Sequence, residues 1–277
     1  MQRYLVLFLL LIVTAFGAER RAKNIILFLG DAGGIPTLNA ASNYGYNQPR
    51  KLFVQNMPHI ALSETSSASD WVSDSAAGMT AIVTGNKTHN GVIAQSDAAV
   101  RGRKDGEPLK TTLEYAEERG LSTGVVSNSS VASATPAACY AHVNDQRKIG
   151  EIFAQALSPR FGDGVDVIIG PGRAQILKAT QALELDIMAA LPAKGYKLCD
   201  SLDAIPRDAR RVVALFDNDD FDLGVATQRA IEILSRNPKG FFLMVESDLH
   251  TDNMVRGFGT NGGLRQDYQP NGGANGQ

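Results

Sequence analysis

The sequence is poor in histidine and cysteine, and it carries almost no net charge. Its 277 residues include four histidines and two cysteines, and the balance of basic and acidic residues leaves a net charge of −2. Lys and Arg are spread along the chain and form no run, which gives no reason to expect a nucleic-acid partner. The two cysteines, Cys139 and Cys199, leave two alternatives open, namely one disulfide or two buried thiols.

Long apolar runs are absent once the first residues have passed. Residues 5–13 are apolar, follow Arg3 and lead to small residues at 15–18, which is the pattern of a secretory signal peptide. The run is shorter than the roughly 20 residues that a membrane-spanning helix needs. We therefore predict a signal peptide over residues 1–18, export to the periplasm or the extracellular space, and no stable membrane anchor.

What the sequence does contain is a series of short, continuous apolar runs. They predict buried strands at residues 24–29, 122–127, 165–173, 212–216 and 241–245. Helical patterns alternate with them at residues 111–119, 174–194 and 226–234. This alternation predicts an α/β fold, a three-layer sandwich with a largely parallel central sheet flanked by helices. The apolar content of 44% is enough for a substantial core.

A serine stands at a predicted helix start in the segment 74–91, which reads D-S-A-A-G-M-T-A-I-V-T-G-N-K-T-H-N-G. Asp74 and Ser75 suit a helix cap, and Ala76 and Ala77 favour the first turn. The start of a helix offers unpaired N–H groups and a positive dipole end to an anion such as phosphate. Two interpretations follow: a nucleophile that meets a phosphate, or an ordinary capped core helix.

The order D-S-A-A-G-M-T-A-x-x-T-G-x-K-T-x-x-G in this segment resembles the nucleophile signature of the alkaline phosphatases. A-T-P-A-A-x-x-A-H at residues 134–142 is similar to a second motif of that family. The resemblance extends, as separated motifs, over most of residues 23–253. It implies hydrolysis of small phosphate monoesters through a phosphoserine at Ser75, with Zn²⁺ and Mg²⁺ as cofactors, and it allows a homodimer.

The resemblance implies metal ligands at two further positions. Asp31 follows a predicted strand and precedes glycines, so it is either a turn residue or a ligand at a strand end. The resemblance implies that it bridges two metals. Thr135 is either the cap of a helix with Pro136 at its first position or, as the resemblance implies, a ligand of Mg²⁺.

Acidic residues follow the last predicted strand. The segment 246–252 reads E-S-D-L-H-T-D, which places Glu246, Asp248, His250 and Asp252 at a strand's carboxyl end. Carboxylates and an imidazole are suitable ligands for Mg²⁺ and Zn²⁺, whereas a solvated acidic loop is the alternative. The resemblance implies that Glu246 holds Mg²⁺. It leaves open which of the other three bind Zn²⁺.

The family also carries an arginine that binds phosphate just after the histidine that matches His142. Arginine suits that role because its planar fork donates two hydrogen bonds to phosphate oxygens. Gln146 stands where we expect the arginine, and Arg147 comes one position later. Either Arg147 reaches the site or the clamp is weakened. We expect His142 itself to be structural.

The end of the chain is rich in Gly, Asn and Gln, which predicts disorder over residues 258–277. The family would continue with a strand ending in Asp-His and a distant histidine, and neither occurs here. We therefore expect residues 19–257 to be the N-terminal portion of a catalytic domain that is incomplete at its C-terminal side. Two other hypotheses stay open: a related hydrolase of phosphodiesters, phosphonates or sulfate esters, and a non-catalytic remnant.

Overall fold

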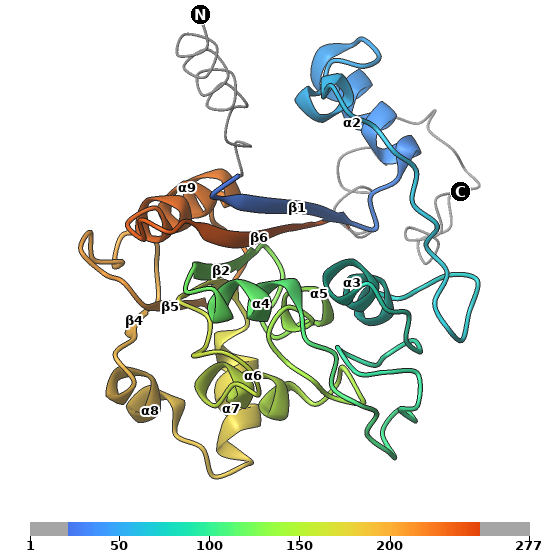
Figure 1. Cartoon of the computed structure of the whole chain (residues 1–277). Helices are drawn as coiled ribbons and strands as arrows, with labels where there is room; N and C mark the ends of the chain where they lie inside the picture. The colour runs from blue at the N-terminus through green and yellow to red at the C-terminus, as the bar shows by residue number, and fades with distance from the viewer. Residues whose placement is uncertain (1–21, 250–277) are drawn as a thin grey trace, which may run out of the picture.

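The computed structural model describes residues 22–249, which form an α/β fold around one sheet (Figure 1). The strands are β1 (Ile25–Asp31), β2 (Ser122–Ser127), β3 (Val167–Pro171), β4 (Lys197–Cys199), β5 (Val212–Phe216) and β6 (Phe241–Asp248). Every pairing is parallel, and the strand order is β1-β6-β2-β3-β5-β4. The predicted parallel sheet is confirmed.

Two strands run further than their apolar runs predicted. β1 continues through Gly30 to Asp31, and β6 continues to Asp248. The extra residues pair with each other, since Asp31 is the register partner of Asp248. Backbone pairing therefore extends the strands after their apolar side chains end. The structure also adds β4, which is too short to give a pattern of its own.

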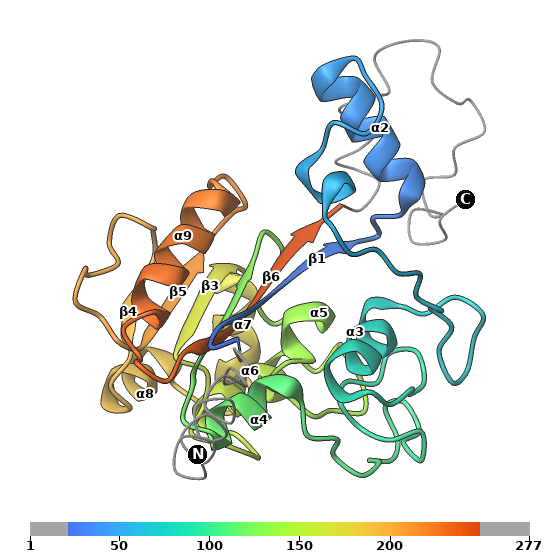
Figure 2. The ribbon, with the colours of Figure 1, turned by 45° about the horizontal axis from the view of Figure 1, so that its top comes forward.

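Helices cover both faces of the sheet, as the three-layer prediction requires. They are α2 (Ile35–Tyr46), α3 (Ser75–Thr84), α4 (Thr112–Glu118), α5 (Ala134–Ala137), α6 (Ile149–Leu157), α7 (Arg173–Gln181), α8 (Ile187–Ala193) and α9 (Leu223–Leu234). α9 packs on one face through Ala230 and Ile233, and helices α3 to α8 contribute to the core on the other face (Figure 2). α2 stands beyond the carboxyl end of β1.

The single helix predicted over residues 174–194 is wrong, because the structure has two helices there. Glu184 adopts a left-handed conformation with φ of 58°, which ends the first helix. Asp186 then caps α8 by accepting hydrogen bonds from the backbone N–H groups of Met188 and Ala189. The break depends on backbone conformation and capping, which the apolar periodicity does not report.

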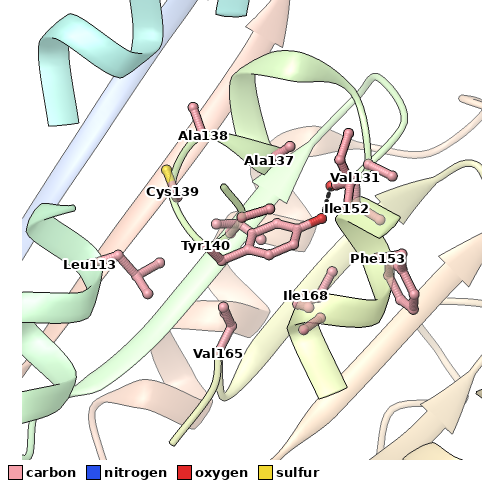
Figure 3. Close-up of a cluster of buried hydrophobic side chains, with 14 of the residues drawn as sticks. Leu113, Val131, Ala137, Ala138, Cys139, Tyr140, Ile152, Phe153, Val165 and Ile168 are labelled. Atoms are coloured by element: carbon pink, nitrogen blue, oxygen red, sulfur yellow. Dashed lines mark hydrogen bonds between the residues drawn. The ribbon is translucent and has the colours of Figure 1, made fainter. Parts of the chain in front are cut away.

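The larger core cluster packs around Tyr140 (Figure 3). Its ring is buried among apolar side chains that include Leu113 and Ile168, and its hydroxyl donates a hydrogen bond to the carbonyl of Val131 at 2.8 Å. The hydrogen bond satisfies the one polar group of a buried tyrosine, and burial raises its pKa.

Both cysteines and His142 are structural. Cys139 and Cys199 are buried free thiols, which decides between the two alternatives for them. The His142 ring lies 2.8 Å from the Ala94 carbonyl through Nδ1 and 2.7 Å from the Glu114 carboxylate through Nε2. Because a carbonyl only accepts hydrogen bonds, Nδ1 carries a proton. The expectation for His142 is confirmed.

Glu117, at the edge of the sheet opposite to the strands' carboxyl ends, is a buried acid. Its carboxylate accepts hydrogen bonds from the Thr123 hydroxyl at 3.0 Å and from the Gly164 N–H at 3.2 Å. Burial nevertheless raises its pKa from 4.5 to about 7, and the charges of Asp163 and Asp166 act in the same direction. The folded protein therefore favours the protonated form of Glu117.

This shift predicts a pH dependence of stability. The protonated form is favoured on folding, so the contribution of Glu117 is complete below pH 4.5 and is lost as the pH rises from 4.5 to about 7. The loss is on the order of 3 kcal/mol. Glu117→Gln should remove that slope and raise the free energy of unfolding at pH 8, as measured in urea. Glu118→Gln, which removes an exposed carboxylate, should change it by less than about 1 kcal/mol. An equal slope in wild type and Glu117→Gln would contradict the assignment.

Candidate active site

The site is built on the carboxyl ends of three adjacent strands. β6 lies between β1 and β2, with Asp31 opposite Asp248 and Ser127 opposite Glu246. Parallel strands end at the same edge of a sheet, and this edge is where ligands bind in open α/β folds. The structure therefore places Asp31, Glu246 and Asp248 at the same edge of the sheet, although 214 residues lie between Asp31 and Glu246 in the sequence.

Ser75 is the first residue of α3, which begins in front of this edge. Asp74 is the N-cap, and its carboxylate accepts a hydrogen bond from the Ala77 N–H at 3.0 Å. The Ser75 hydroxyl donates a hydrogen bond of 2.7 Å to Asp31 Oδ2. The other Asp31 oxygen accepts a hydrogen bond from the N–H of Ala32 at 2.9 Å, so both oxygens of the carboxylate have a partner. The serine and the aspartate singled out in the sequence are thus in direct contact.

Thr135 approaches the same carboxylate from α5. Its hydroxyl lies 3.4 Å from Asp31 Oδ2 and also hydrogen-bonds to Glu246. The predicted local structure is wrong in detail, because Ser133 is the N-cap and Pro136 is the third residue of the helix. Proline is tolerated there because the first N–H groups of a helix have no partner within it. In this position Thr135 is buried, and its hydroxyl lies beside Asp31 and Glu246.

Glu246 is a buried carboxylate with few neutralising partners. The Ser127 hydroxyl donates a hydrogen bond to its Oε2. Burial raises the pKa of Glu246 to about 7, the hydrogen bonds from Ser127 and Thr135 oppose that shift, and the charges of Asp31 and Asp248 add to it. Several acids with little positive charge nearby form an environment that a cation would stabilise.

The oxygen atoms gathered at this edge of the sheet are of the types that bind metal ions. Carboxylate and hydroxyl oxygens of Asp31, Thr135 and Glu246 are the ligand types that Mg²⁺ prefers. Within residues 22–249, however, no three His, Cys, Asp or Glu side chains converge as a metal-binding group. His250 and Asp252, which the sequence singled out for Zn²⁺, lie outside the described residues.

A cavity of about 810 Å³ opens in front of Ser75. Asp31, Asp74 and Thr135 line it, and so does Glu64 from the segment before α3. Among the described residues that line it, several are acidic and none is Lys, Arg or His. An anionic ligand in this cavity would therefore depend on the N-terminus of α3 and on bound cations for its positive partners.

Gln146 and Arg147 have different surroundings in the structure. Gln146 Nε2 donates to Asp74 Oδ2 at 3.0 Å, and the Gln146 backbone N–H donates to the Gly91 carbonyl at 2.8 Å. Arg147 is exposed and lines a different depression, together with Lys148 and Lys178. The structure therefore places a neutral amide next to the cap of the Ser75 helix, and Arg147 is not among the described residues that line the cavity.

Sequence analysis missed three polar residues that surround the site. Asn90 accepts a hydrogen bond from the Asp74 N–H at 3.1 Å, Ser127 contacts Glu246, and Asn128 contacts the backbone of Asp248. Ser127 and Asn128 carried one signal, since they are small polar residues that end a buried strand. Asn90 carried no such signal, because the whole of α3 lies between Asn90 and its partner Asp74 in the sequence.

The sequence and the fold are similar to those of known phosphatases. The family model for alkaline phosphatase matches residues 22–193, which is more than half of the chain. The chain belongs to the alkaline phosphatase family. The human tissue-nonspecific alkaline phosphatase is 29% identical over 284 aligned positions that cover 81% of this chain, and an alkaline phosphatase of Gadus morhua is 30% identical over 82% of it.

Solved structures agree with the family assignment. The alkaline phosphatase of the Antarctic bacterium TAB5 aligns with a TM-score of 0.68 and 27% identity, covering 81% of this chain and 64% of its own. That of Thermus thermophilus aligns with a TM-score of 0.69 and 26% identity, covering 82% of this chain and 50% of its own. A His135Asp mutant of the TAB5 enzyme contains Mg in a site called M3.

The relatives are longer than the part that matches. The chain spans 54% of the human protein and 60% of the Gadus morhua protein. The fold and the family are therefore shared, whereas the activity of the whole relatives does not transfer without an argument from this chain's own residues.

The capping role of Asp74 can be tested against a matched cap elsewhere in the fold. Asp74→Ala should lower the free energy of unfolding by about 1 kcal/mol, because the Ala77 N–H loses its partner. Asp222→Ala removes the cap of α9, where Asp222 accepts from the Val225 N–H at 3.0 Å, and should cost a similar amount. Hydrogen exchange should speed up at the first turn of α3 in the first variant only. Unchanged exchange there would show that Asp74 does not fix this helix start.

Proposed function

We propose that this chain carries the nucleophile half of a phosphomonoesterase site, in which Ser75 attacks the phosphorus of a small phosphate ester. The observation that carries the proposal is the 2.7 Å hydrogen bond from the Ser75 hydroxyl to Asp31, at the start of α3 and at the wall of the cavity. The family assignment supports the same reaction, because its relatives are phosphatases by name.

The geometry indicates how Ser75 would act. Its proton points to Asp31, so the lone pairs of its oxygen remain available to an ester in the cavity. A bond forms from the Ser75 oxygen to phosphorus as the bond to the ester oxygen breaks, and the alcohol leaves with a proton. Water then attacks the phosphoserine, releasing phosphate and returning the hydroxyl. In both steps, the backbone N–H groups at the start of α3 would donate hydrogen bonds to the phosphate.

The described residues fit Mg²⁺ better than they fit Zn²⁺. Asp31, Thr135 and Glu246 would hold Mg²⁺, because they offer hard oxygen donors next to a buried charge. Asp31 and Asp248 would contribute to Zn²⁺, with His250 and Asp252 proposed as further ligands. When bound, such ions supply Lewis acidity that lowers the pKa of a hydroxyl and neutralises phosphate charge.

Export is part of the proposal. It is supported by the signal-peptide pattern at residues 1–18, which lie outside the described residues, as does the tail at 258–277. No helix within the described part of the chain is long and apolar enough to cross a membrane. Homodimer formation stays a prediction of the family resemblance.

The role of Ser75 is tested by comparing two serines of one cavity. Ser75→Ala should lower the rate of phosphate release from an aryl phosphate, with Zn²⁺ and Mg²⁺ present, by roughly 1,000-fold or more. Ser73→Ala, which also alters the cavity wall, should retain most of the rate. Peptide mapping after rapid quenching should find phosphate on Ser75. Turnover that persists in Ser75→Ala would reject the mechanism, and absence of turnover in the wild type would favour a non-catalytic remnant.

Gln146 offers a second test, because the described cavity lining contains no basic side chain. Gln146→Arg places a cation beside Asp74, and a charge-assisted hydrogen bond to phosphate should lower the inhibition constant of inorganic phosphate by about 10-fold or more. Arg147→Gln should leave that constant unchanged, since Arg147 lies outside the cavity. Weaker phosphate binding in Arg147→Gln would show instead that Arg147 reaches the site. Comparing monoesters, diesters and sulfate esters in the same variants would separate the alternative substrate classes.

A further inference from the structure

Two polar residues at the end of β2 contact the acidic end of β6 and have no part in the mechanism above. Ser127 is the last residue of β2, and Asn128 follows it. Each reaches one of the residues that contribute acidic side chains to the site, and the paired residues are 119 and 120 positions apart in sequence. Both contacts are side-chain contacts, so they are specific to the residues present here.

Ser127 fixes the orientation of the Glu246 carboxylate. The Ser127 side chain is fully buried, and its oxygen accepts a hydrogen bond from the Ser129 N–H at 2.9 Å. With its oxygen held in this way, the hydroxyl proton is directed to Glu246 Oε2. Oε2 of the carboxylate is thus held by Ser127, and the Thr135 hydroxyl supplies a further hydrogen bond to Glu246.

Asn128 fixes the backbone at Asp248. Its Oδ1 accepts a hydrogen bond from the Asp248 N–H at 2.6 Å, and its Nδ2 lies 3.5 Å from the Asp248 carbonyl. The amide thus continues the β2–β6 ladder by one step after β2 has ended. On the other side of β6, the Leu249 N–H donates to the Asp31 carbonyl at 3.0 Å. The end of β6 is therefore held from both neighbouring strands.

We infer that Ser127 and Asn128 are positioning residues for a divalent cation, Ser127 by aiming Glu246 and Asn128 by fixing the strand end that carries Asp248. The inference rests on the proposed function, because it assigns the cation to the same site. Groups that hydrogen-bond to a metal ligand fix its orientation, and losing one such group typically weakens metal binding by roughly 10- to 100-fold. A purely structural role would lower stability and leave cation affinity unchanged.

The test measures Mg²⁺ binding to the purified full chain by isothermal titration calorimetry. Ser127→Ala should raise the Kd for Mg²⁺ by roughly 10-fold or more. Ser127→Thr, which keeps the hydroxyl, should restore it to within about threefold of the wild type. Ser122→Ala is the matched control, because it removes a serine hydroxyl at the opposite end of the same strand. Its Kd should equal that of the wild type.

Asn128→Ala provides a second variant at a half-buried position, in case Ser127→Ala does not fold. It should also raise the Kd for Mg²⁺ by roughly 10-fold. An unchanged Kd in the folded variants of both residues would overturn the inference and leave the proposed function standing. A wild type that binds no Mg²⁺ would instead overturn the metal-dependent function, and the inference would fall with it.

Discussion

The parallel pairing of β6 with both β1 and β2 is the constraint on which the site depends. This pairing sets Asp31 opposite Asp248 and Ser127 opposite Glu246, so one register fixes the relative positions of the three acids and of the serine that orients one of them. A shift of one residue would turn every side chain of β6 to the other face of the sheet. The apolar residues Leu243 and Met244 resist such a shift, because they are buried in the two separate cores on opposite faces.

The same register places acidic side chains close to one another, which makes the charged form of Glu246 unfavourable. Glu246 is buried beside Asp31 and Asp248, and its pKa is raised to about 7. The nearby donors are hydroxyls, which oppose the shift without cancelling it. In contrast, Glu114 is equally buried but lies 2.7 Å from the His142 ring and accepts a hydrogen bond from the Thr111 N–H. The two buried acids therefore differ in their surroundings, because Glu114 has an imidazole partner within the protein and Glu246 lies beside other acids.

Much of the fold could be predicted from the sequence, because apolar runs and helix caps are local signals. The runs at 122–127 and 212–216 form strands with those same bounds, and Asp74 caps the helix that begins with Ser75. What could not be predicted depends on pairing in space. The extension of β6 to Asp248 follows from its pairing with β1, and the contact of Gln146 with Asp74 joins residues that are 72 positions apart.

The position of β1 in the sheet finally determines how firmly Asp31 is held. β1 is an edge strand, and within the described residues it pairs with β6 alone. Phe28 is 64% exposed, although strands of parallel sheets are usually covered on both faces. Leu27 and Leu29 pack on the larger core and compensate in part. Asp31 therefore depends on one ladder of hydrogen bonds and one buried face, and on its own contacts with Ser75 and Ala32. Ser75 and the end of β1 therefore stabilise each other through the hydrogen bond between them, which joins the start of α3 to the edge of the sheet.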